Sequence, residues 1–157
     1  MIKICVFSDS HGCPENLIAA VEREGPAVCF FLGDGQEDLA DVQTRFPALP
    51  FYAVRGNCDV RSELSASLTC AVGGVTVFAV HGHRHDVKHE PRLDTLADAA
   101  RAAGASVALY GHTHRAQIKR QPGLLLMNPG SVGRCFRPTY GLLFVENGTV
   151  RAELKRL

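Results

Sequence analysis

The chain has 157 residues, of which 46% are hydrophobic and 21% are charged, and its formal net charge is +1. These values are typical of one globular domain with its own core, so we expect residues 1–157 to form a single domain. The near-zero charge gives no reason to expect a nucleic-acid or membrane partner, and no apolar run is long enough to span a bilayer.

Apolar segments and helical patterns alternate along the chain. Strands are predicted at 2–7, 27–32, 51–55, 68–72, 75–80, 106–110, 116–120, 124–127, 140–145 and 150–155. Helices are predicted at 14–23, 37–46 and 91–103. Pro14 and Pro91 suit a first helical turn, and Gly25 and Gly104 suit the residue after a helix. The later strands resemble hairpins, so we predict a mixed α/β domain with parallel strands first and antiparallel strands after them.

The six cysteines and the N-terminus bear on the compartment of the protein. No two cysteines form a CxxC pair, which excludes a zinc ribbon and a thioredoxin-like motif. The apolar stretch at the N-terminus is too short for a signal peptide. We therefore expect a cytoplasmic protein without a disulfide framework.

Polar side chains that can bind a metal follow five of the predicted strands. They are Asp9, His11, Asp34, Asn57, His81, His112 and His114. Sites in open α/β sheets lie outside the carboxyl ends of the strands, so these side chains are expected to converge. Oxygen and nitrogen ligands without thiolates suit manganese, iron, zinc or nickel. Seven ligands are too many for one tetrahedral ion and suit two ions that share a carboxylate.

Charge and spacing add detail to this predicted site. Only two of the seven ligands are carboxylates, so two divalent ions would leave the site about two units positive and attractive to phosphate. His112 and His114 are two residues apart, as are Asp9 and His11. Side chains alternate along an extended backbone, so we expect each pair to share a face. Glycines at 33, 56 and 111 are expected to let the backbone approach the site closely.

Together these motifs resemble those of the calcineurin-like metallophosphoesterase superfamily. Its pattern D-x-H, G-D, G-N, H and G-H-x-H stands here as Asp9-Ser10-His11, Gly33-Asp34, Gly56-Asn57, His81 and Gly111-His112-Thr113-His114. The segment 128-NPGSV-132 also resembles the small branch of YfcE-like phosphodiesterases. The resemblance covers essentially the whole chain and implies a four-layer αββα sandwich, with two mixed β-sheets flanked by helices.

The resemblance also implies how the metals are held and used. One ion is expected on Asp9, His11, Asp34 and His114, and the other on Asp34, Asn57, His81 and His112, with Asp34 bridging. Mn²⁺ is the expected ion, and Ni²⁺, Fe²⁺ and Zn²⁺ are alternatives. A hydroxide that bridges the ions would attack phosphorus in line with the leaving oxygen. Asn57 would also orient the phosphate.

One departure from the family pattern leaves the general acid open. Larger members have histidine directly after G-N, whereas this chain has Cys58 there. A thiol is a poor substitute for imidazole as an acid at neutral pH. Asp59 and His83 are the candidates for this catalytic role. Arg134 and Arg137 are candidates for binding the substrate phosphate, since a guanidinium can hold phosphate bidentately.

Three functions fit these residues. The first is a phosphodiesterase that acts on a small phosphate ester, and the second is a phosphomonoesterase or pyrophosphohydrolase that uses the same site. The third is a protein-binding scaffold with weak or no catalysis, as in the retromer subunit that resembles this branch. Every expected ligand is present, which favours an enzyme. No basic stripe indicates nucleic acid, and a homodimer or homotetramer is the expected assembly.

Overall fold

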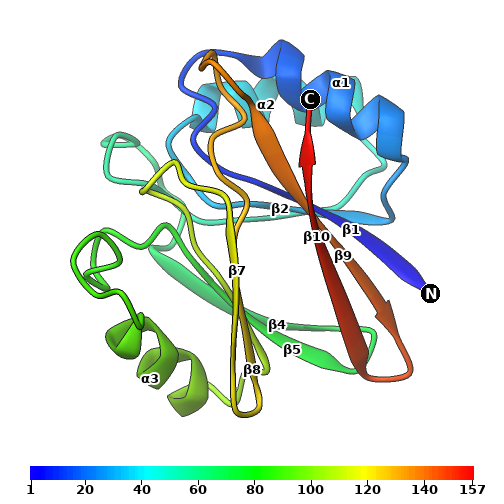
Figure 1. The fold of residues 1–157 in the computed structure, drawn as a ribbon. Coiled ribbons are helices and arrows are strands. Elements are labelled where there is room, and N and C mark those ends of the chain that lie inside the picture. Colours follow the sequence, from blue (N-terminus) through cyan, green and yellow to red (C-terminus); the bar gives the residue numbers. More distant parts are fainter.

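The computed structural model describes residues 1–157 as three helices and ten strands (Figure 1). In chain order these are β1 (Ile2–Phe7), α1 (Pro14–Glu24), β2 (Val28–Phe31), α2 (Gln36–Arg45), β3 (Phe51–Ala53), β4 (Ser67–Val72), β5 (Val75–Val80), α3 (Asp94–Ala102), β6 (Val107–Leu109), β7 (Gln117–Gln121), β8 (Leu124–Asn128), β9 (Thr139–Glu146) and β10 (Thr149–Arg156). Each predicted strand and helix is therefore present, with ends that shift by a few residues.

The strands form two five-stranded sheets that face each other (Figure 1). The strand orders are β10-β9-β1-β2-β3 and β4-β5-β6-β8-β7. Buried aliphatic side chains of both sheets, such as Ile4 and Val6 from β1 and Val77 from β5, make one core between them. Helices α1 and α2 pack on the outer face of the first sheet, and α3 packs on the outer face of the second. The predicted four-layer sandwich with two mixed sheets is confirmed.

Local sequence explains why the central elements form where they do. β1 lies between β9 and β2, with the facing sheet on one of its faces and helices on the other, and its residues 4–7 are an uninterrupted apolar run. α1 begins at Pro14 and ends before Gly25, which adopts a left-handed conformation with φ 54°. None of the three helices has the length and hydropathy needed to cross a bilayer.

Two details of the predicted layout were wrong. The later strands are not all antiparallel, because β6 pairs in parallel with both β5 and β8. α3 carries the chain from β5 to β6 as a crossover, and β7 then pairs with the far edge of β8. The third helix begins at Asp94 and not at Pro91, because Leu93 takes a left-handed conformation with φ 58° that a helix cannot continue.

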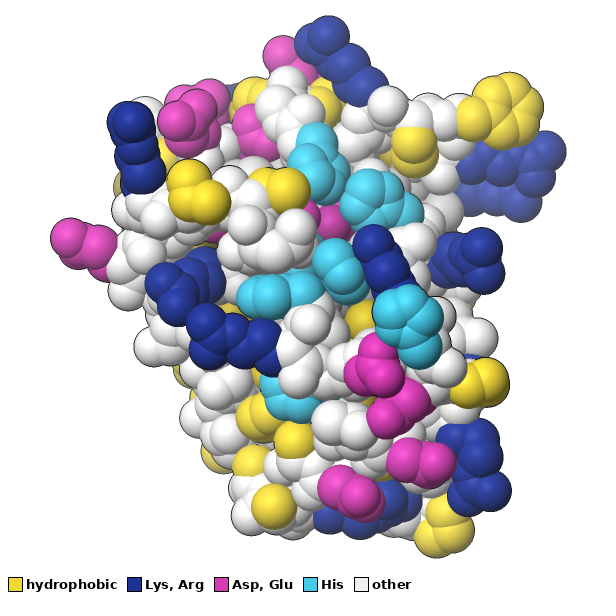
Figure 2. All heavy atoms as spheres, turned by 90° about the vertical axis from the view of Figure 1, so that its left-hand side faces the viewer, with side chains coloured by type: hydrophobic (Ala, Val, Ile, Leu, Met, Phe, Trp, Pro, Cys, Tyr) yellow, Lys and Arg dark blue, Asp and Glu magenta, His cyan; other side chains and the backbone are white.

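The parallel pairs bring the loops that carry the predicted ligands to one side of the molecule. β1, β2 and β3 run in the same direction, and so do β5 and β6 in the facing sheet. The loops that follow these five strands meet where the edges of the two sheets face each other. On that face the histidine side chains gather around acidic atoms in the middle of the surface (Figure 2).

Candidate metal centre

Asp9 lies two residues after β1, and its side chain is fully buried. Its Oδ2 accepts hydrogen bonds from the Ser8 hydroxyl at 2.5 Å and from the His112 backbone N–H at 3.1 Å. Its Oδ1 has no hydrogen-bond partner. Nε2 atoms of three histidines lie near Oδ1, at 3.1 Å for His114, 3.5 Å for His11 and 3.8 Å for His81. A buried carboxylate oxygen that faces three imidazole nitrogens fits a shared cation.

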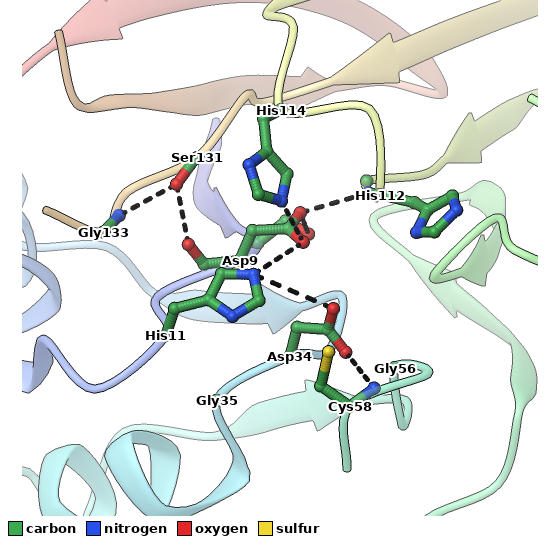
Figure 3. Close-up of polar contacts among 12 residues, drawn as sticks. Asp9, His11, Asp34, Gly35, Gly56, Cys58, His112, His114, Ser131 and Gly133 are labelled. Atoms are coloured by element: carbon green, nitrogen blue, oxygen red, sulfur yellow. Dashed lines mark hydrogen bonds and ion pairs between the residues drawn. The ribbon is translucent and has the colours of Figure 1, made fainter. Parts of the chain in front are cut away.

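Asp34, after β2, provides the second carboxylate and faces His11 (Figure 3). On its other side is His81. Asp34 Oδ2 is 3.3 Å from His81 Nε2 and 3.8 Å from His11 Nε2, while its Oδ1 accepts the Cys58 backbone N–H at 2.8 Å. Burial alone would raise the pKa of Asp34, but the neighbouring His81 and the hydrogen bond from the Cys58 backbone outweigh it and lower that pKa. Asp34 is therefore charged at neutral pH and occupies the position expected of a bridging ligand.

His81, after β5, is oriented by the backbone of the facing sheet. Its Nδ1 lies 2.7 Å from the carbonyl oxygen of Leu32. A carbonyl oxygen only accepts, so Nδ1 carries the proton and Nε2 faces the carboxylates. That Nε2 is buried without a hydrogen-bond partner. Like Asp9 Oδ1, it is a polar atom with no partner from the protein, as expected of a metal ligand.

The His112 ring lies away from the group around Asp9 (Figure 3) and is next to the His81 ring. The centres of the His81 and His112 rings are 5.1 Å apart. Burial, together with the nearby charge of Lys88, lowers the pKa of His112 to about 4. The imidazole is thus neutral at pH 7, which is the form that binds metals.

Side-chain ligand atoms within 4.8 Å of one another define three overlapping groups. These groups are Asp9 with His11 and His114, Asp9 with Asp34 and His81, and His11 with Asp34 and Cys58. Five of the seven predicted ligands are brought together in this way, while the His112 ring belongs to none of the groups. The Asn57 side chain is exposed, and its Nδ2 contacts Cys58 Sγ at 3.5 Å.

The backbone of the ligand loops is not extended, so the expected alternation of side chains is wrong as an explanation. Five predicted ligands have left-handed backbone conformations, with φ between 43° and 68°; they are Asp9, His11, Asp34, His112 and His114. Aspartate and histidine tolerate this region better than most residues. Tight left-handed turns at the strand ends therefore set the directions of these side chains.

Two of the predicted glycines permit close packing around the carboxylates. A Cβ atom at Gly56 would lie 2.0 Å from Asp34 Oδ1, and one at Gly111 would lie 2.0 Å from Ser8 Oγ. Any side chain at either position would push a carboxylate or its hydrogen-bond partner out of place. The expected close approach of the backbone at these glycines is confirmed.

Asp59, a predicted candidate for the general acid, holds the loop around Asp34 in place. Its carboxylate accepts four backbone N–H groups at 2.8–3.1 Å, from Asp34, Gly35, Gln36 and Gly56. Four donors stabilise the charged carboxylate and leave no lone pair facing the site. This geometry favours a structural role over proton donation.

Two residues of 128-NPGSV-132 support the ligand loops, and Asn128 was missed by sequence reasoning. The Asn128 amide donates to the carbonyl oxygen of Gly111 at 3.0 Å and to Thr113 Oγ1 at 2.9 Å. Ser131 Oγ donates to the carbonyl oxygen of Asp9 at 2.7 Å. Both side chains are buried. A polar residue at the end of an apolar strand was the available signal.

The remaining predicted residues lie at the edge of the site. The His83 ring is 5.6 Å from that of His81 and 6.1 Å from that of His112, measured between ring centres. Burial and the positive charges near it lower the pKa of His83. Arg134 and Arg137 are exposed, and the Arg137 guanidinium lies 5.2 Å from the centre of the exposed Phe136 ring. Neither arginine bonds to a residue of the centre.

Comparison with known families agrees with the geometry of the centre. A sequence model of the calcineurin-like phosphoesterase superfamily domain matches residues 2–148. The chain belongs to this superfamily. The protein named "Probable metallophosphoesterase YsnB" of Bacillus subtilis is 34% identical over 156 residues, which cover 96% of this chain and 89% of that protein. Membership in the superfamily supports a metal-dependent phosphoesterase that binds divalent ions.

Solved structures share the fold at low sequence identity. Vps29 from Entamoeba histolytica, solved in complex with zinc, superposes with a TM-score of 0.78 at 20% identity and covers 99% of both chains. A structure described as an archaeal phosphodiesterase superposes with a TM-score of 0.74 at 21% identity, covering 98% of this chain and 100% of that one. Proteins with different names thus share the calcineurin-like fold.

Proposed function

We propose that this superfamily member is a phosphodiesterase with two divalent ions. The observation that carries the proposal is the position of Asp34 between His11 and His81, beside two buried ligand atoms without protein partners, Asp9 Oδ1 and His81 Nε2. A single cation would leave one end of this arrangement without charge compensation, whereas two cations that share Asp34 would satisfy both ends.

The chain's own residues divide into two ligand sets around Asp34. Asp9, His11 and His114 would hold one ion with it, and Asn57, His81 and His112 would hold the other. Asn57 would join its set by turning its amide away from Cys58 Sγ. These oxygen and nitrogen ligands suit Mn²⁺, with Ni²⁺, Fe²⁺ and Zn²⁺ as alternatives.

Bound divalent ions would supply an activated water and would neutralise charge on the phosphoryl oxygens. The protein would contribute orientation and space. Asn57 is placed to orient the phosphate once its amide faces the centre. A cavity of about 450 Å³ opens beside His11, Asp34 and Cys58, large enough for a substituent of a phosphate diester.

Protonation of the leaving group is the weakest part of this centre. Burial and the neighbouring Asp34 raise the pKa of the Cys58 thiol. Asp59 is held by four backbone donors, which leaves His83 as the remaining candidate. Diesters with good leaving groups are therefore expected to react much faster than those with poor ones.

A comparison of two aryl esters tests the proposal. Metal-free protein would be given Mn²⁺ and then bis(p-nitrophenyl) phosphate or p-nitrophenyl phosphate. We expect metal-dependent hydrolysis of the diester, and Asp34→Ala should lower kcat/KM by about 10³-fold or more because both ions lose a ligand. Asp41→Ala, which removes an exposed carboxylate on α2, is the matched control.

The other outcomes select the alternative functions. Faster hydrolysis of the monoester would point to a phosphomonoesterase that uses the same ligands. Hydrolysis of neither ester, with two bound ions confirmed, would favour the protein-binding scaffold. A scaffold needs an exposed apolar surface for its partner. The exposed large apolar side chains here, Met1, Tyr52, Val60 and Phe136, come from separate segments.

A further inference from the structure

Two arginines beside the centre have no partner within the protein. Arg55 directly precedes Gly56 in the loop after β3, and Arg84 lies in the loop that begins at His81. Neither guanidinium takes part in a hydrogen bond or an ion pair, whereas Arg45 and Arg151 each pair with a glutamate. Arg55 is half-buried, and Arg84 is exposed. Two guanidinium groups without a counter-charge from the protein are available to an anion from outside the chain.

The two arginines line the same cavity, which adjoins the metal centre. This cavity has a volume of about 300 Å³, and its other lining residues include Asn57 and His83. It shares Asp59 and Val60 with the larger cavity that reaches His11 and Asp34. Lysine and arginine side chains gather beside the histidines on this face of the molecule (Figure 2). An anion in the smaller cavity would therefore lie next to the scissile phosphate.

The smaller cavity offers the two guanidinium groups no counter-charge from the protein. No carboxylate in the cavity is free to neutralise them, because the only one that lines it, Asp59, is held by four backbone donors.

We propose that Arg55 and Arg84 bind a second phosphate group of the substrate, so that the natural substrate is a phosphate diester that carries a further phosphate. The inference rests on the proposed function. A diester has one negative charge, which the divalent ions already compensate. The two guanidinium groups therefore require further negative charge on the substrate. A terminal phosphate with nearly two charges matches them, and its oxygens fit the planar donor fork of arginine.

This assignment differs from the one that the sequence suggested. Arg134 and Arg137 were the candidates because they follow 128-NPGSV-132. In the structure they line neither of the two cavities. Arg55 and Arg84 were not singled out, because each is an ordinary residue beside a motif and only the fold brings them together.

A matched pair of substrates tests the proposal. Thymidine 5′-(p-nitrophenyl phosphate) and the same ester with a 3′-phosphate have one leaving group and differ only in the second phosphate. We expect the wild-type protein to prefer the 3′-phosphorylated ester in kcat/KM by about 10- to 100-fold, the range for one or two charge-assisted hydrogen bonds. Arg55→Gln combined with Arg84→Gln should bring the ratio close to one, mainly through KM.

Two other arginine variants control this result. Arg120→Gln removes the same charge from an exposed position on β7 and should leave the ratio as in the wild type. Equal rates for the two esters in the wild type, or an unchanged ratio in the double variant, would overturn the proposal. A ratio that falls in Arg134→Gln and not in the double variant would overturn it as well.

A binding measurement separates this inference from the proposed function. Thymidine 3′,5′-bisphosphate would be titrated calorimetrically into the metal-free protein, where no hydrolysis is needed. The double variant should bind it at least about 10-fold more weakly than the wild type. Arginine-dependent binding without hydrolysis would refute the phosphodiesterase and keep the anion site. Hydrolysis with equal binding by both proteins would refute the anion site and keep the phosphodiesterase.

Discussion

The two halves of the candidate centre differ in how far the protein alone assembles them. The Asp9 half consists of Asp9, His11 and His114, whose ligand atoms already lie within 4.8 Å of one another. The Asn57 half consists of Asn57, His81 and His112. In it only His81 faces the carboxylates, while Asn57 contacts Cys58 and the His112 ring lies beside His81.

Support from the rest of the fold explains this difference. Asp9 is buried, and Ser131 and the His112 backbone hold its loop through hydrogen bonds. Asn57 is on an exposed part of its loop, where solvent competes for its amide. An ion that enters the Asp9 half meets a formed site, whereas one that enters the Asn57 half must reorder side chains. The two affinities should therefore differ, with the Asp9 half filled first.

The largest expected effect comes from removing one histidine from each half. His114→Ala should weaken the tighter Mn²⁺ site by about 100-fold or more, and His112→Ala should weaken the looser site while sparing the tighter one. Calorimetric titration of the metal-free variants with Mn²⁺ would measure both sites. If both variants lost the same site, or if His112→Ala removed the tighter one, the division into halves would be wrong.

A smaller effect is expected from Asp59, which braces the loop of the Asn57 half. Asn at this position keeps one acceptor oxygen and turns an amide toward backbone donors. Asp59→Asn should therefore lower the free energy of unfolding by about 2 kcal/mol, as measured by urea denaturation. Asp41→Asn is the exposed control.

The pH profile of the same variant separates bracing from proton donation. A general acid makes kcat fall at high pH, where the acid is deprotonated. If Asp59 only braces the loop, this alkaline limb should lie at the same pH in Asp59→Asn as in the wild type, with kcat lower at every pH. Loss of that limb would make Asp59 the general acid after all. A diester with a poor leaving group is the substrate to use, because protonation then limits the rate.

The smallest effect concerns a cluster remote from both halves. The Glu24 carboxylate forms an ion pair with Lys3 Nζ at 2.6 Å and accepts a hydrogen bond from the Tyr140 hydroxyl at 2.7 Å. Burial alone would raise the pKa of Glu24, but these contacts lower it overall. Glu24→Gln should reduce the free energy of unfolding by about 1–2 kcal/mol at pH 7.

The sign of the pH dependence follows from the lowered pKa of Glu24. Its stabilisation is complete above the unfolded-state pKa of about 4.3 and is lost as the pH falls further, so the variant should approach the wild type near pH 3. Glu22→Gln, on the exposed pair with Arg45, should change stability by less than about 0.5 kcal/mol. Metal affinity in both halves should be unaffected, and a change there would link this cluster to the centre.

The sequence predicted the strand ends well because buried strands are runs of apolar residues. Residues 4–7 of β1 and the whole of β2 are apolar, and the polar residue that follows each run marks the edge of the sheet. Parallel pairing then places Asp9 and Asp34 side by side. The convergence of ligands from distant parts of the chain was therefore predictable from local patterns together with one rule of topology.

Side-chain partners across loops were less predictable, because they depend on the path of each loop. Nothing local distinguishes Asp59 as an acceptor of four backbone donors or Asn128 as a support for the loop of Gly111. The direction of β6 was also missed, because the short connection to β7 reads as a hairpin. These side-chain partners and strand directions depend on how the two sheets pack against each other in the folded chain.

The left-handed conformation of five predicted ligands has a consequence for protein engineering. Each such residue carries a conformational penalty that glycine would not have, of about 1 kcal/mol for an L-residue in this region. Selection of variants for thermal stability alone should therefore enrich glycine at these positions, including Asp9 and His114. The most heat-resistant descendants of this protein would be those that had lost the centre, so a stability screen here needs a metal-binding readout beside it.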